Sequence, residues 1–91
     1  MRRVVWSDQA LEQLEAITTY VRTDSPVAAA RLEARIVGKA DSLVLMPERG
    51  QLISRGRRVI AVTRTYLLCY VVVGEEVRIL SVLHTARRPE A

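Results

Sequence analysis

A single histidine and a set of arginines are the residues of this sequence whose chemistry suggests a reaction. His84 is the only histidine among 91 residues, and several arginines lie near it or in the preceding segments: Arg55, Arg57, Arg58, Arg64, Arg87 and Arg88. A histidine can act as a general acid or base and arginines can hold a scissile phosphate, so this set could cleave RNA. A histidine that hydrogen-bonds the C-terminal turn explains the same residue structurally. Because no proton-transfer partner stands near it in the sequence, we favour the structural role.

Other kinds of site receive little support. The sequence has no Walker A loop, no glycine-rich dinucleotide fingerprint and no Cys-x-x-Cys pair, so we expect no cofactor. One histidine and one cysteine leave too few ligands for zinc, so we expect no metal. Cys69 lies in an apolar run and is interpreted as a small core residue. It cannot form an internal disulfide, which favours a reducing cytosol.

The positive charge is concentrated in the second half of the chain. Basic residues outnumber acidic ones 14 to 10, for a net charge of +4. Residues 1–48 carry 6 basic and 7 acidic side chains, whereas residues 49–91 carry 8 and 3, which gives net charges of −1 and +5. All but one of the basic residues are arginine, which binds carboxylate and phosphate in a planar, bidentate manner. The C-terminal half therefore predicts a surface for nucleic acid or for an acidic protein segment.

The length and apolar pattern indicate one domain over residues 1–91. No apolar run approaches the roughly 18 residues of a membrane span. The first residues also lack the apolar region of a signal peptide. We therefore expect a cytoplasmic protein without membrane contact.

The N-terminal half is predicted to form a strand over residues 2–6 and two helices. Ser7-Asp8 supplies an N-cap, and apolar residues then recur at helical spacing at Leu11, Leu14, Ile17 and Val21. Ser25-Pro26 marks the start of a second helix, which is expected to end near Met46-Pro47. A linker of about four residues predicts an antiparallel helix hairpin.

The C-terminal half changes to the alternating pattern of strands. Residues 48–57 are expected to form a loop, followed by strands over 58–65, 66–73 and 77–84. The strand 66–73 is apolar on both alternating positions, so it should be central and covered on at least part of each face. The predicted class is α+β: an N-terminal strand, an antiparallel helix hairpin packed on one face, and a three-stranded antiparallel meander.

Several segments in this order resemble the ParE branch of the RelE/ParE toxin superfamily. Those segments are Val4-Val5-Trp6-Ser7 leading into Ala10-Leu11-Glu12-Gln13-Leu14, Tyr20-Val21, Leu43 to Pro47 followed by Gly50, Tyr66-x-x-x-Tyr70, and Val82-Leu83-His84-Thr85-Ala86-Arg87. The resemblance covers nearly the whole chain. It implies the toxin of a type II toxin–antitoxin module, which a small antitoxin neutralises by direct contact. ParE-like members are associated with inhibition of DNA gyrase, and RelE-like members cleave mRNA on the ribosome.

The residues at three positions favour the gyrase branch. RelE-like nucleases tend to carry an arginine just after the first tyrosine of the central strand, where this sequence has Leu67. They also carry basic and aromatic residues after the last strand, where Thr85 and Ala86 stand here. We therefore expect a non-enzymatic toxin that inhibits gyrase. The alternatives are a ribosome-dependent mRNA endonuclease that uses His84, and a nucleic-acid-binding module without toxicity.

The resemblance also implies an antitoxin partner, and charge and predicted exposure suggest the residues that it contacts. Antitoxins of this kind use an acidic, partly disordered segment, so we expect a cognate ParD-like antitoxin to cover basic residues of the toxin: Arg31, Arg35, Arg57, Arg58 and Arg64. The residues expected to contact the target are His84, Arg87 and Arg88. DNA contact is expected only through the toxin–antitoxin complex.

Overall fold

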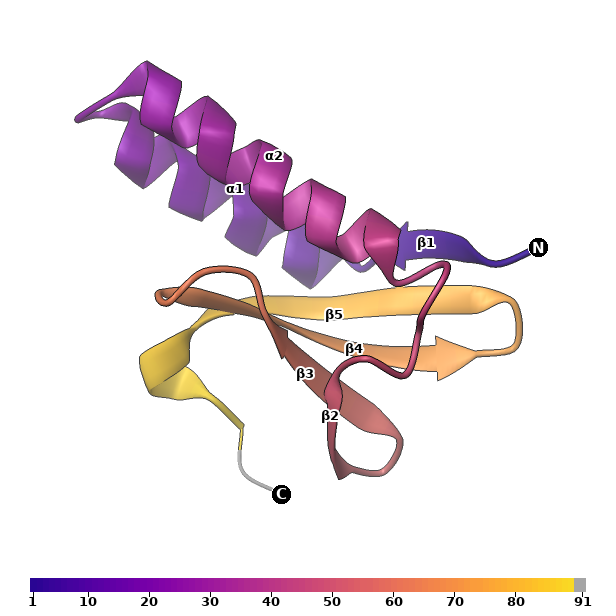
Figure 1. Cartoon of the computed structure of the whole chain (residues 1–91). Helices are drawn as coiled ribbons and strands as arrows, with labels where there is room; N and C mark the ends of the chain where they lie inside the picture. Colours follow the sequence, from indigo (N-terminus) through magenta and orange to yellow (C-terminus); the bar gives the residue numbers. More distant parts are fainter. Residues whose placement is uncertain (90–91) are drawn as a thin grey trace.

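The computed structural model describes residues 1–89 and contains two helices packed on one face of a sheet (Figure 1). The chain runs through β1 (Arg3–Trp6), α1 (Asp8–Arg22), α2 (Pro26–Ser42), β2 (Gln51–Ser54), β3 (Arg57–Ala61), β4 (Tyr66–Val73), β5 (Glu76–His84) and the short 3-10 helix η1 (Thr85–Arg87). The five strands have the order β1-β5-β4-β3-β2. β1 is parallel to β5, and the other neighbours are antiparallel. The predicted α+β architecture is confirmed.

Both helices begin where the sequence predicts. The Ser7 side chain accepts a hydrogen bond from the Ala10 amide at 3.0 Å, and Ser25 accepts one from Ala28 at 3.1 Å. These contacts satisfy amides that have no partner inside the helix. No helix in the described part of the chain is long and apolar enough to cross a bilayer.

The second helix is shorter than predicted and ends at Ser42. The Ser42 hydroxyl donates to the Lys39 carbonyl at 2.6 Å, a local bond that competes with helix continuation. Leu43 is fully buried, whereas Leu45 and Met46, in the turn that follows, are exposed. The prediction that the helix ends near Met46-Pro47 was wrong, because the apolar residues after Ser42 belong to a turn and not to the helix.

The segment predicted as a loop contains a strand, so the meander has four strands. Arg55 and Gly56 have φ angles of 52° and 78° and form the two-residue turn that joins β2 to β3. Such a turn has the twist that antiparallel neighbours require. The next strand ends at Ala61, whereas residues 58–65 were predicted, because Thr63 accepts hydrogen bonds from the amides of Thr65 and Tyr66 and closes a turn.

The prediction that residues 66–73 form a central strand covered on at least part of each face is confirmed. β4 is the middle strand of the sheet. Leu68 and Tyr70 belong to the core cluster beneath the helices. Leu67 and Cys69 form a second cluster with Val59 on the other face. The alternating residues of one strand therefore serve two apolar layers.

A bulge in β5 changes which side chains face the helices. Cys69 pairs with Ser81 and Tyr70 pairs with Ile79, so Leu80 is the extra residue. Ile79 and Val82 consequently both belong to the helix-side cluster although they are three positions apart. The bulge therefore determines which side chains at the end of β5 face α1, where the candidate functional site lies.

The loop between α2 and β2 is attached to the sheet through Tyr70. The Tyr70 hydroxyl accepts a hydrogen bond from the Gly50 amide and donates one to the Pro47 carbonyl, both at 2.8 Å. Burial raises the pKa of Tyr70, so the hydroxyl keeps its proton. Arg58 adds hydrogen bonds to the carbonyls of Gly50 at 2.8 Å and Glu48 at 3.3 Å. These contacts hold an irregular segment in one conformation.

Candidate functional site

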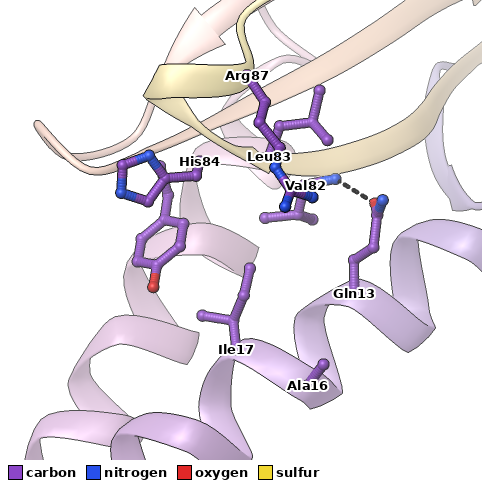
Figure 2. Close-up of a pocket in the computed structure, with 8 residues that line it drawn as sticks. Gln13, Ala16, Ile17, Val82, Leu83, His84 and Arg87 are labelled. Carbon is purple, nitrogen blue, oxygen red and sulfur yellow. Dashed lines mark hydrogen bonds between the residues drawn. The ribbon is translucent and has the colours of Figure 1, made fainter.

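A cavity of about 370 Å³ lies between α1 and the C-terminal end of β5 (Figure 2). Its walls come from α1, the start of β4, the end of β5 and η1: Gln13, Ala16, Ile17, Tyr66, Val82, Leu83, His84 and Arg87. The volume lies within the range of ligand pockets, about 300–1,000 Å³. The floor is apolar and the rim carries one imidazole and one guanidinium group. This combination suits a ligand with an apolar body and negative charge.

His84 has the contact expected of a structural histidine at the C-terminal turn. Its Nδ1 accepts a hydrogen bond from the Ala86 amide at 3.0 Å, where the chain enters η1. The ring also meets Tyr66 edge to face, with centroids 5.9 Å apart and an interplanar angle of 75°. Because Nδ1 is an acceptor, the neutral ring carries its proton on Nε2. His84 could still donate a hydrogen bond from Nε2 to a ligand.

The three residues predicted to contact the target do not all face this cavity. His84 and Arg87 line it, and Figure 2 shows the Arg87 side chain extending from η1 over Leu83 and Val82. Arg88 instead donates a hydrogen bond to the side chain of Gln51 in β2. The C-terminal segment therefore reaches from the cavity to β2, the strand at the far edge of the sheet.

The five arginines predicted to bind the antitoxin do not form one continuous surface. Arg57 and Arg58 are neighbours in β3, so their side chains lie on opposite faces of the sheet. Arg57 donates to the Ser54 hydroxyl at 2.9 Å, and Arg35 of α2 donates to the Val62 carbonyl at 3.2 Å. Arg31 and Arg64 are exposed. A partner that touches all five must wrap around the protein.

The ion pairs gather around the turn between β4 and β5 and the N-terminal residues. Glu75 contacts the N-terminal amine at 3.0 Å, and Glu76 contacts Arg3 at 2.6 Å and Arg78 at 2.8 Å. The amine lowers the pKa of Glu75, and the two guanidinium groups lower the pKa of Glu76. Within residues 1–89, none of the arginines predicted to bind the antitoxin or the target forms an ion pair. Their charge is therefore available to a partner.

Gln13 is a cavity residue that the sequence did not single out. Its side-chain Oε1 accepts a hydrogen bond from the Val82 amide at 2.8 Å and so connects α1 to β5. An amide side chain on the inner side of an amphipathic helix, between Ala10 and Leu14 of the core, was the available signal.

The buried cysteine lies outside this cavity. Cys69 is 2% exposed on the other face of the sheet. Burial raises the pKa of its thiol more than the Arg57 charge and the Ser81 hydrogen bond lower it. Within residues 1–89, no three His, Cys, Asp or Glu side chains gather closely enough to hold a metal ion.

We expect Cys69 to react with an aromatic disulfide reagent at pH 8 at least about a hundredfold more slowly than free cysteine. Opening of a core strand costs several kcal/mol, and each 1.4 kcal/mol slows the reaction about tenfold. The raised thiol pKa acts in the same direction, because less thiolate is present. Absorbance of the released thiolate measures the rate, with protein in denaturant as the fully reactive control. Rapid reaction of the folded protein would contradict the buried position.

Comparisons with known proteins identify the relatives of this chain. Residues 4–89 match the family described as "ParE toxin of type II toxin-antitoxin system, parDE". The protein named Toxin RelE2 from Caulobacter vibrioides is 40% identical over 87 residues, which cover 96% of this chain and 99% of that protein. Putative toxin Y4kP from Sinorhizobium fredii is 34% identical over 85 residues, covering 91% and 88%. A solved structure described as the chromosomal ParDE TA system from P. aeruginosa has a TM-score of 0.79 and 25% identity, covering 92% and 96%.

Proposed function

Because the chain belongs to the ParE toxin family of type II toxin–antitoxin systems, we propose that it inhibits DNA gyrase and is neutralised by a ParD-like antitoxin. Gyrase acts in the cytoplasm, so this function places the protein there. The antitoxin binds the toxin directly and carries any DNA contact of the complex. The protein acts as an inhibitor by protein contact and not as an enzyme.

The observation that carries the choice of gyrase is the environment of Leu67. This residue stands where RelE-like nucleases tend to carry an arginine, and it is 1% exposed in the apolar cluster with Val59 and Cys69. A buried leucine cannot hold a scissile phosphate. Loss of a transition-state donor costs roughly 10²–10³ in rate, so this position supports a function without RNA cleavage.

A ribosome-dependent mRNA endonuclease is the second candidate function. The cavity brings His84, Tyr66 and Arg87 together, and these groups could transfer protons and hold a phosphate. One relative also carries the name Toxin RelE2. Against this function, His84 Nδ1 is already occupied by the Ala86 amide. The two functions differ in how they depend on His84.

We expect the purified protein to block DNA supercoiling by gyrase. We expect His84→Ala to retain most of this inhibition, because Arg87 and Arg88 remain as predicted target contacts. The inhibitor function requires protein contact, whereas RNA cleavage requires the imidazole and would fall by roughly 10²–10⁴ without it. Gel electrophoresis of relaxed plasmid with gyrase and ATP measures the first activity. Translation in a purified system measures the second.

The control for this experiment is the same protein mixed with its antitoxin, which should restore supercoiling. Full supercoiling in the presence of the toxin alone would refute the gyrase proposal. A translation block that disappears in His84→Ala would establish the nuclease function instead.

A further inference from the structure

A second cavity, of about 370 Å³, lies between the N-terminal residues and the loop that follows α2. Its lining residues are Arg2, Leu45, Met46, Pro47, Glu48 and Arg49. Arg2 directly precedes β1, whose first residue Arg3 pairs with Glu76 at the start of β5, whereas His84 lies at the end of β5. The N-terminus and the loop lie on one side of the molecule, and η1 lies on the other (Figure 1). The two cavities are therefore separated by the length of β5.

The apolar side chains of this second cavity face solvent. Leu45 is 86% exposed and Met46 is 61% exposed, and Pro47 follows them directly. In the part of the chain that the structure describes, neither Leu45 nor Met46 belongs to an apolar cluster of the core. Single exposed apolar residues are common on protein surfaces, but adjacent ones beside a cavity mark interaction sites. Methionine and arginine are also enriched in protein–protein interfaces.

Hydrogen bonds to the rest of the protein fix the loop that carries these side chains. The Tyr70 hydroxyl binds both the Gly50 amide and the Pro47 carbonyl at 2.8 Å. Arg49 donates to the Ser42 hydroxyl at the end of α2 at 3.0 Å. A segment that is already ordered loses less conformational entropy when it binds a partner. The loop therefore presents exposed apolar groups in one fixed arrangement.

The charged side chains of the second cavity favour an acidic partner. Two of its residues are arginines and one is a glutamate. Within residues 1–89, neither Arg2 nor Arg49 forms an ion pair. Arginine binds carboxylates in a planar, bidentate manner, so a carboxylate complements this excess of positive charge. A partner that fits the cavity presents apolar side chains next to a carboxylate.

We propose that residues 45–49, together with Arg2, form a surface that contacts DNA gyrase, with Leu45 and Met46 as the apolar anchors. This inference rests on the proposed inhibition of gyrase and assigns one part of that contact to a place in the fold. A few well-placed anchors carry most of the affinity of a protein interface. The surface adds to the predicted target contacts at the other end of β5.

Other occupants fit this surface less well. A second copy of the chain would bring the arginines of both copies together, and each copy carries a net charge of +4. Nucleic acid binding uses several phosphate contacts, whereas half of the lining residues here are apolar. None of the arginines predicted to bind the antitoxin lines this cavity. The observed chemistry therefore favours a protein target over these occupants.

Replacement of both apolar anchors tests the proposal. We expect the double variant Leu45→Ser, Met46→Ser to need about a hundredfold higher concentration for half-maximal inhibition of DNA supercoiling, with about tenfold from each residue. Because both side chains are exposed, the variant should fold and melt like the natural protein. Val27→Ser is the matched control, since Val27 is also 61% exposed but lies at the start of α2. Unchanged inhibition by the folded double variant would overturn the proposal.

Opposite charge changes at neighbouring positions test the carboxylate contact. We expect Arg49→Glu to raise the concentration for half-maximal inhibition about tenfold, because it repels an acidic partner. Glu48→Gln should instead lower this concentration about threefold, because it removes a like charge. Damage to the loop would weaken inhibition in both variants. Weaker inhibition by Glu48→Gln would therefore overturn the proposed partner chemistry.

Oxidation of Met46 by hydrogen peroxide gives a direct readout of the contact. The exposed thioether should react in the free protein, and at least about fivefold more slowly when gyrase is in excess, because oxidation follows exposure. Mass spectrometry of the peptide that contains Met46 measures the rate, with free methionine in the same tube as the reference. Equal oxidation with and without bound gyrase would place the contact elsewhere and overturn the proposal.

The same measurements separate this inference from the proposed function. If the natural protein inhibits gyrase but neither the double variant nor Met46 oxidation responds, the surface is wrong although the gyrase function stands. If the natural protein does not inhibit gyrase, the proposed function fails and this contact fails with it. The double variant is also tested for antitoxin affinity and for its mass in solution. A loss of antitoxin binding or of a dimer, with inhibition unchanged, would assign the surface to that occupant and overturn the proposal.

Discussion

Gly50→Ala is expected to lower the free energy of unfolding by about 3 kcal/mol, which combines overpacking with damage to a buried hydrogen bond. A Cβ at this position would lie 2.6 Å from the Tyr70 hydroxyl oxygen and 2.9 Å from the Val59 carbonyl oxygen. The backbone carbonyl cannot rotate away as a flexible side chain could. Small domains have total stabilities of about 5–15 kcal/mol, so this single methyl group removes a large share. Urea denaturation followed by circular dichroism measures the change.

Gly38→Ala is the matched control for this substitution. Gly38 lies inside α2, and a Cβ there meets no atom within 4 Å. The same chemical change should stabilise the protein by about 0.5–1 kcal/mol, because alanine favours the helix. Opposite signs for the two substitutions would locate the effect in the contact of Gly50 with Tyr70 and β3. Equal effects would contradict this explanation.

A double-mutant cycle with Tyr70→Phe separates the clash from the hydrogen bond. Tyr70→Phe alone removes the acceptor of the Gly50 amide and the donor to Pro47, at a cost of about 1–3 kcal/mol. With the hydroxyl absent, Gly50→Ala should cost less than in the natural sequence, so the two effects should not add. Tyr20→Phe, at a tyrosine that is 74% exposed, should change stability little.

Charge reversal of both Arg57 and Arg58 is expected to weaken antitoxin binding about a hundredfold, with about tenfold from each residue. Neither arginine forms an ion pair within residues 1–89, and both are only partly buried. An acidic partner segment would supply the missing carboxylates. Because the attraction is electrostatic, the loss should shrink as salt concentration rises. Isothermal titration calorimetry at two salt concentrations measures both effects.

The two arginines require separate controls for folding. Arg58 holds the carbonyls of Gly50 and Glu48, so its substitution should also lower stability by about 1–2 kcal/mol. Within residues 1–89, the Arg57 side chain hydrogen-bonds only to the Ser54 hydroxyl, so its substitution gives the cleaner variant. Arg2→Glu, a charge reversal beside the N-terminus, controls for net charge. Unchanged affinity of a folded Arg57→Glu, Arg58→Glu protein would remove these residues from the antitoxin surface.

Most of the architecture could be predicted from local patterns in the sequence. Ser7 and Ser25 mark the helix starts because a serine cap before apolar residues satisfies free amides, and both caps are present. The central position of residues 66–73 followed from an apolar pattern on both faces. The strand β2 was missed because it is short and rich in polar residues. Its turn also places Arg55, and not only a glycine, at a positive φ angle.

The candidate site was only partly predictable. His84 and Arg87 were singled out by residue type, and both line the cavity. Gln13 was missed because glutamine in a helix is ordinary, and only its contact with the Val82 amide gives it a role. The predicted arginine group was identified by charge alone. Charge in a sequence does not show that Arg57 and Arg58 leave opposite faces of one strand or that Arg88 turns to Gln51.

Caps, alternation and net charge are local or additive properties, so the sequence alone was sufficient for the elements, their order and the basic character of the second half. The bulge at Leu80, the length of β1 relative to β5 and the distribution of arginines over two faces depend on the pairing of distant residues. A shift of one residue in that pairing moves side chains to the other face. The tertiary structure therefore decided where the cavity and, within residues 1–89, the arginines without an ion-pair partner lie.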